Sequence, residues 1–212
     1  MKSLRIFFVL PIVAGCILGC NLSINKTITI ADGESVRGSQ NTVNGNILIG
    51  SNCEVNGDCR SVNGVIEVGS NSKVKDLQTV NGRITIEGEV TVRGKIESVN
   101  GPVVCDPGVE IYGGVATVNG SIDLENTVVR RDITTYNGDI KLLRRSVVQG
   151  DIIVKRSKGN SHRRRRLKIE IAEESVVEGN LIVKDKYMDV KVILSEGGKV
   201  NGRIRNAEVI EG

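Results

Sequence analysis

Side chains that could do acid–base, nucleophilic or metal chemistry are few and scattered in this sequence. There is one histidine, His162, and no Cys-x-x-Cys pair, so we expect no metal site and no other cofactor. Acidic residues such as Glu67, Glu87 and Asp123 alternate with apolar positions, as solvent-facing strand residues do. An enzyme acting on glycans would need paired carboxylates and usually aromatic platforms, yet the chain has no Trp, two Phe and three Tyr. The sequence therefore predicts no catalytic residues.

A basic segment, residues 155–168, is the strongest electrostatic feature. It holds eight cations and no acid; because the chain carries +4, subtracting these eight charges leaves −4 for the rest. We expect a protruding loop or hairpin. Its arginines could bind anions such as acidic lipid or lipopolysaccharide, although a solvated loop without a partner is the alternative. We expect no nucleic-acid binding, because no aromatic residues interleave with the charge. The candidate anion contacts are Arg163, Arg164, Arg165 and Arg166.

The N-terminus has the pattern of a signal peptide. Two cations precede a ten-residue apolar run, Ile6 to Gly15, which is too short to cross a bilayer. The sequences before Cys16 and Cys20 both resemble the lipobox of bacterial lipoproteins, which implies lipidation of one of these cysteines. Cys16 fits the pattern better, whereas Cys20 gives a longer apolar region. No Asp follows either cysteine, which by that resemblance implies outer-membrane delivery; ordinary secretion or an uncleaved anchor is the alternative.

A repeated tripeptide sets the organisation of the remaining chain. Val-Asn-Gly starts at 43, 62, 80, 99 and 118, with Tyr136-Asn137-Gly138 as a near copy and Val200 to Gly202 as a late echo. The six regular starts are 18 or 19 residues apart. A fixed period of this kind is typical of solenoid proteins, in which each repeat packs only on its neighbours.

Each period predicts short strands. Counted from its first Val, the fifth and seventh positions are aliphatic, as in Ile66 and Val68, and two further aliphatic positions follow, as at Val74 and Leu77. No helical spacing occurs, and one repeat is too small to bury a core alone. We therefore predict an all-β fold, a parallel β-helix with about 18–19 residues per coil.

The Asn-Gly pairs are expected to form corners rather than hairpin turns, because hairpins would not repeat one register with a single Asn-Gly per period. In such a corner, Gly would take a backbone conformation that other residues avoid. The asparagines would stack as a hydrogen-bonded ladder. The predicted ladder comprises Asn44, Asn63, Asn81, Asn100, Asn119 and Asn137.

The period divides the chain into four parts: a signal peptide with its lipobox (1–20), regular coils (21–154), the basic segment (155–168), and C-terminal coils with a closing cap (169–212). Cys53, Cys59 and Cys105 fall in columns that are otherwise aliphatic, so we expect them to be buried as small apolar residues. A Cys53–Cys59 disulfide is the alternative in an oxidising compartment.

These coils resemble bactofilins, the polymer-forming cytoskeletal β-helix proteins of bacteria. The resemblance rests on the period and on segments such as Val147 to Ile152 and Val176 to Leu181. It implies a right-handed, three-sided helix and possible end-to-end homo-oligomers; the lipobox and the basic segment depart from the family. With the lipobox, it suggests a lipid-anchored envelope protein with a structural, scaffolding or adhesive role. A self-assembling filament protein and an enzyme acting on envelope polysaccharide are the alternatives.

Overall fold

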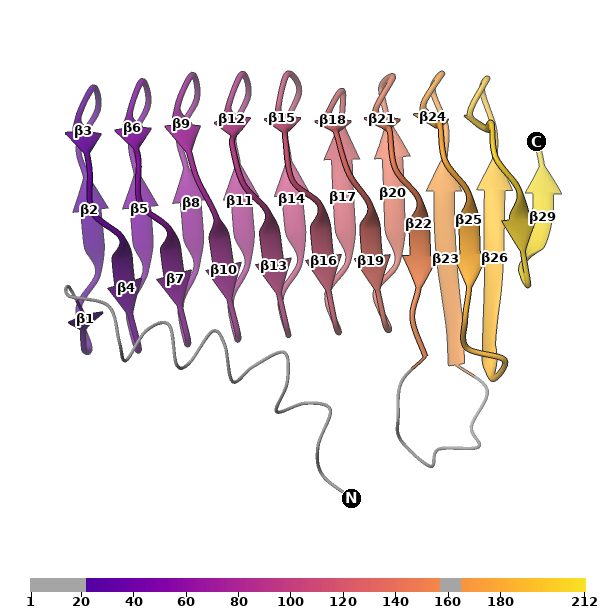
Figure 1. Cartoon of the computed structure of the whole chain (residues 1–212), viewed down its shortest axis with the longest axis horizontal. Helices are drawn as coiled ribbons and strands as arrows, with labels where there is room; N and C mark the ends of the chain where they lie inside the picture. Colours follow the sequence, from indigo (N-terminus) through magenta and orange to yellow (C-terminus); the bar gives the residue numbers. More distant parts are fainter. Residues whose placement is uncertain (1–21, 157–164) are drawn as a thin grey trace.

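The computed structural model describes residues 22–156 and 165–212, and this part of the chain is entirely β-strand and connecting corners. The strands form a three-sided parallel β-solenoid of about nine turns (Figure 1). This confirms the predicted parallel β-helix. The expected signal peptide and both lipobox cysteines lie outside the described residues.

Three parallel sheets make the three sides, and each coil contributes one strand to each sheet. Sheet A contains β1 (Leu22–Ser23), β4 (Gln40–Thr42), β7 (Cys59–Ser61), β10 (Leu77–Thr79), β13 (Ile96–Ser98), β16 (Val115–Thr117), β19 (Ile133–Thr135), β22 (Ile152–Val154), β25 (Leu181–Val183) and β28 (Ile204–Arg205). Sheet B contains β2 (Ile28–Ile30), β5 (Ile47–Ile49), β8 (Ile66–Val68), β11 (Ile84–Ile86), β14 (Val103–Cys105), β17 (Ile122–Glu125), β20 (Ile140–Leu143), β23 (Arg165–Ile171), β26 (Met188–Leu194) and β29 (Glu208–Glu211). Sheet C contains β3 (Ser35–Val36), β6 (Glu54–Val55), β9 (Lys73–Val74), β12 (Thr91–Val92), β15 (Glu110–Ile111), β18 (Val128–Val129), β21 (Val147–Val148), β24 (Val176–Val177) and β27 (Lys199–Val200).

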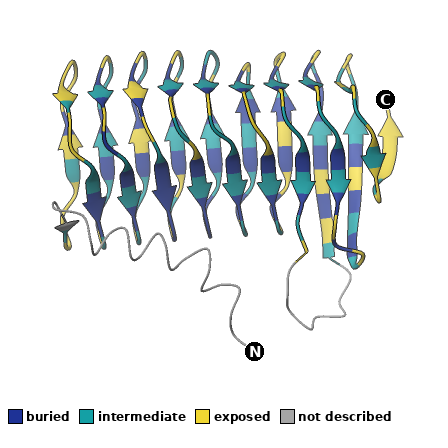
Figure 2. Ribbon diagram, in the orientation of Figure 1, coloured by how far each residue is buried: buried dark blue, intermediate teal, exposed yellow. Residues whose placement is uncertain are grey.

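The core forms because equivalent residues of successive coils pair in register. In sheet B, Ile84 is opposite Ile66 on one side and Val103 on the other. All three are fully buried, as Figure 2 shows for the inward positions along the rod. Inward and outward residues alternate within each strand, so the aliphatic columns of the sequence become continuous apolar columns inside the solenoid.

The glycines of the Val-Asn-Gly corner are required by close approach and not by an unusual backbone conformation. Among the described glycines, positive φ angles occur only at Gly33, Gly108 and Gly197, none of which belongs to this corner. A Cβ on Gly101 would lie 1.8 Å from the carbonyl oxygen of Gly82, one coil earlier. The expectation of a special conformation is therefore wrong, because the constraint acts between coils.

Three further expectations about the C-terminal part need correction. The late echo, Val200 to Gly202, lies at a different corner, since Val200 pairs with Val177 in sheet C. The basic segment is not a loop throughout, because β23 begins at Arg165. No segment among the described residues closes the C-terminal end: β27, β28 and β29 are the last strands of their sheets.

Replacing Gly101 by Ala tests the close-approach argument. The clash with the Gly82 carbonyl should lower the free energy of unfolding by about 3 kcal/mol, in the range of overpacked sites. Gly33→Ala is the control: φ is +77° there but no atom lies within 4 Å of the added Cβ, so only about 1 kcal/mol of backbone strain is expected. Denaturant unfolding measures both; a smaller loss for Gly101→Ala than for Gly33→Ala would contradict the argument.

Candidate functional site

The corner asparagines form a continuous file of side-chain hydrogen bonds along one edge of the rod. Each Nδ2 donates to the Oδ1 of the equivalent asparagine one coil earlier, over 2.7–2.8 Å. The file also includes Asn25, which was not predicted and which accepts from Asn44. Because every amide points the same way, the last oxygen of the file, on Asn137, accepts from no asparagine among the described residues. The members are Asn25, Asn44, Asn63, Asn81, Asn100, Asn119 and Asn137.

Arg165 occupies that last acceptor. Its Nη1 donates to Asn137 Oδ1, and its Nη2 lies 2.6 Å from Asp185 Oδ2. The Asp185 side chain is only 2 % exposed, and its other oxygen accepts the Tyr187 backbone N–H over 3.0 Å. A cation at the oxygen end of aligned amide dipoles is electrostatically favourable, and Arg165 links the file to the C-terminal coils.

The structure describes two of the four arginines that were predicted to contact anions. Arg163 and Arg164 lie outside the described residues. Arg165 is bound to Asp185 and Asn137, so its guanidinium serves the fold. Arg166 is exposed on β23 and stands opposite Asp189 in the register with β26. Anion binding by this run stays a prediction for the residues that the structure does not describe.

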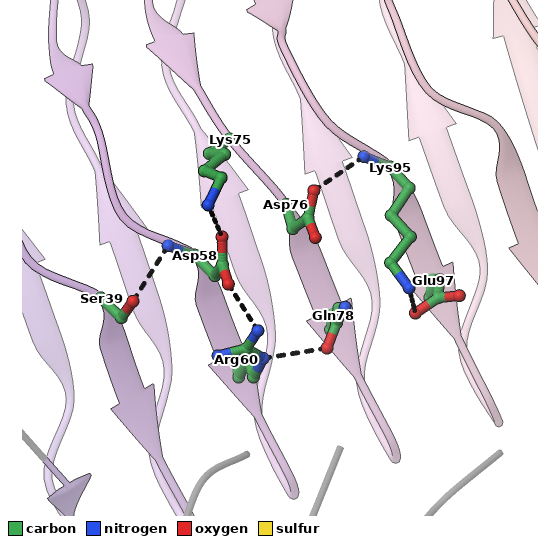
Figure 3. A network of polar contacts seen from close by, with 8 residues as sticks. All are labelled: Ser39, Asp58, Arg60, Lys75, Asp76, Gln78, Lys95 and Glu97. Carbon is green, nitrogen blue, oxygen red and sulfur yellow. Dashed lines mark hydrogen bonds and ion pairs between the residues drawn. The ribbon is translucent and has the colours of Figure 1, made fainter. Parts of the chain in front are cut away.

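A second polar cluster, not anticipated from the sequence, lies on the outer face of sheet A in the N-terminal half of the rod, around β7 and β10 (Figure 3). Asp58 forms ion pairs with Arg60 over 2.5 Å and with Lys75 over 3.1 Å. Arg60 also donates through Nε to Gln78 Oε1 over 3.0 Å. The Lys75 and Gln78 contacts join two neighbouring coils, and Arg60 and Gln78 are opposite each other in the register of sheet A. Their proximity depends on how one coil stacks on the next, which the sequence alone does not show.

At the corner between sheets C and A, carboxylates accept backbone N–H groups of the following coil. Asp76 accepts the N–H of Lys95 over 3.0 Å, as Figure 3 shows, and Asp151 accepts that of Asn180 over 2.7 Å. In each case the carboxylate accepts the backbone N–H of the equivalent residue one coil later. These acids are therefore used in holding coils together.

Two shallow hollows gather charged side chains. One lies on sheet B and includes Asp32, Glu67 and Glu87 in its lining. Asp32 and Glu87 accept backbone N–H groups of Ser51 and Ser70 over 2.8 and 3.0 Å. The other hollow lies at the corner between sheets B and C, where its lining arginines and glutamates are largely engaged with each other. Its ion pairs are Arg144–Glu125 and Arg145–Glu174.

The three described cysteines are free and buried, as expected from their columns, and the alternative of a Cys53–Cys59 disulfide is wrong. Burial raises the pKa of the Cys59 thiol from 9.0 to about 12, with a smaller contribution from Asp58. Burial also raises the pKa of Cys105, with Asp106 adding to it. Since the thiolate is the reactive form, neither sulfur is activated as a nucleophile.

Comparison with protein-family models, curated proteins and solved structures finds no match to this chain. No helix among the described residues is long and apolar enough to cross a bilayer.

Replacing Arg165 tests whether it anchors the C-terminal coils. Arg165→Met leaves the buried Asp185 carboxylate without its cation, so we expect a loss of about 3–5 kcal/mol in unfolding free energy. The matched control is Lys168→Met on the same strand, because the Lys168–Glu170 pair is exposed and worth less than about 1 kcal/mol. Thermal and denaturant unfolding compare the two.

Neutralising both partners should recover most of the loss. Arg165→Gln combined with Asp185→Asn removes the unpaired charge and retains an acceptor for the Tyr187 N–H. If Arg165→Met and Lys168→Met were equally mild, Arg165 would not be an anchor.

Proposed function

We propose that this protein is a lipid-anchored structural protein of the bacterial cell envelope, acting as a rigid spacer or adhesive scaffold and not as a catalyst. The observation that carries the proposal is the unbroken in-register stacking of all coils. Nine coils at roughly 4.8 Å each give a rod about 40 Å long, which would separate a tethered N-terminus from the opposite end by that distance.

The surface supports a mechanical role. Polar side chains on the outer faces bind one another or backbone N–H groups across coils, as Asp58, Asp76 and Asp151 do. The buried thiols of Cys59 and Cys105 are held in the protonated form. The contacts of these acids hold neighbouring coils together and stiffen the rod.

The lipid anchor is tested by metabolic labelling with an alkyne-bearing fatty acid in bacteria that express the full chain. We expect a labelled band in the membrane fraction, and its loss in Cys16→Ser with retention in Cys20→Ser. The reverse pattern would assign the lipid to Cys20, each variant serving as the control for the other. An unlabelled wild-type protein in the soluble fraction would overturn the proposed location.

Self-assembly into filaments is the second candidate, favoured by the C-terminal end of the rod. β29 is exposed at every residue, and Val209 and Ile210 are 41 % and 37 % exposed. Val209 stacks directly on the fully buried Val192, so the last coil presents an inward column to solvent. An unpaired parallel edge above an apolar column is a template for another strand.

A charge placed in that column tests end-to-end assembly. If filaments of purified protein form, Val209→Lys should abolish them, because an inward lysine would have to be desolvated at the junction. Tyr112→Lys is the matched control, since Tyr112 is 48 % exposed in the middle of the rod. Negative-stain electron microscopy and analytical ultracentrifugation provide the readout. Filaments that survive Val209→Lys, or an absence of filaments in the wild type, would reject this candidate.

A further inference from the structure

Lysine and tyrosine side chains lie together at the C-terminal ends of the strands of sheet A, in the C-terminal third of the rod. Tyr136, Lys155 and Lys184 directly follow β19, β22 and β25. The Lys155 N–H donates to the Thr135 carbonyl and the Lys184 N–H to the Val154 carbonyl, both over 2.8 Å. The three residues therefore form one file, stacked coil upon coil.

Lys186 and Tyr187 lie beside this file, in the connection between β25 and β26 that begins with Lys184. The Lys186 ammonium lies 5.0 Å from the centre of the Tyr187 ring, and the Lys155 ammonium lies 6.0 Å from that of Tyr136. Both distances are in the range of cation–π contacts. We name Tyr136, Lys155, Lys184, Lys186 and Tyr187 the Tyr–Lys corner.

The corner keeps its positive charge because the acid inside it is already bound. Asp185 lies between Lys184 and Lys186 in sequence, but its carboxylate is buried and paired with Arg165. Within residues 22–156 and 165–212, no ion pair joins Lys155, Lys184 or Lys186 to a carboxylate. Three lysine charges thus remain uncompensated by close pairing.

Apolar side chains continue the same face. Ile153 and Ile182 point outward from β22 and β25, two residues before Lys155 and Lys184, and both are half-buried. Neither shallow hollow of the rod includes these residues in its lining. A sheet face with isoleucines beside lysines and tyrosine rings suits an extended surface better than a small enclosed ligand.

We infer that the Tyr–Lys corner binds an anionic lipid surface. Lysines near such a surface are attracted to the head groups, while tyrosine rings favour the boundary between head groups and acyl chains. The lysine stems and the two isoleucines add apolar area beneath the charges. The inference rests on the proposed location at a membrane, but it does not require an N-terminal lipid. It places a side of the rod, and not only its tether, against the bilayer.

Vesicle sedimentation tests the inference with the full chain and vesicles of phosphatidylcholine alone or with 30 % phosphatidylglycerol. The measured quantity is the increase in partitioning caused by the anionic lipid. Apolar binding through the N-terminal segment contributes to both kinds of vesicle and therefore drops out of this difference. Each lysine should contribute about fivefold at low salt. Lys155→Gln, Lys184→Gln and Lys186→Gln combined should therefore reduce the increase by at least about tenfold, and 0.5 M salt should reduce the wild type similarly.

The control variant combines Lys73→Gln, Lys141→Gln and Lys199→Gln, which removes the same charge from exposed positions on sheets B and C. It should lose less than about twofold. Equal losses in both variants would show a general charge effect and overturn the inference. So would selective loss of binding to a soluble polyphosphate with unchanged vesicle binding. Loss of fatty-acid labelling, in contrast, bears only on the proposed anchor.

Discussion

Parallel backbone pairing between successive coils is the constraint on which the whole structure depends. The strands of sheets A and C are two or three residues long, too short to persist alone, and each is held by the strands of the coils before and after it. Pairing in register stacks equivalent positions of successive coils about 4.8 Å apart. A residue type that fits one position therefore also fits the same position in the next coil, where it contacts a copy of itself. Apolar columns, the asparagine file and the glycine file are three results of this one constraint.

A buried hydroxyl column shows how closely the corner and the core are coupled. Ser61 donates to the Gly45 carbonyl over 3.0 Å and Thr79 to that of Gly64 over 3.1 Å. These hydroxyls satisfy carbonyls that the tight corner turns toward the interior, where an unpaired oxygen would be costly. After the last Val-Asn-Gly-like corner the same column continues with valine. The hydroxyl members are Thr42, Ser61, Thr79, Ser98, Thr117 and Thr135, and the valines are Val154 and Val183.

The period predicted the solenoid because it depends on stacking alone, and the asparagine file followed from the same argument. Contacts between coils were harder to foresee. The sequence suggested that the corner glycines adopt a special backbone conformation. The structure shows instead that a Cβ at Gly101 would clash with the Gly82 carbonyl. Asp58 and Lys75 lie 17 positions apart and become partners only when both coils are aligned. Val200 to Gly202 repeats the corner tripeptide, yet it occupies another corner, since the letters alone do not specify which sheet precedes them.

The interruption of the period is tolerated because neighbouring strands lengthen around it. Equivalent residues across it, such as Asp151 and Asn180, are 29 positions apart, compared with 18 or 19 for the asparagine file. β23 and β26 compensate with seven paired residues each, from Arg165 opposite Met188 to Ile171 opposite Leu194. Closing a longer connection costs little additional entropy. The first residue of this extended pair, Arg165, binds the final oxygen of the asparagine file, so the ladder ends where the strands begin to lengthen.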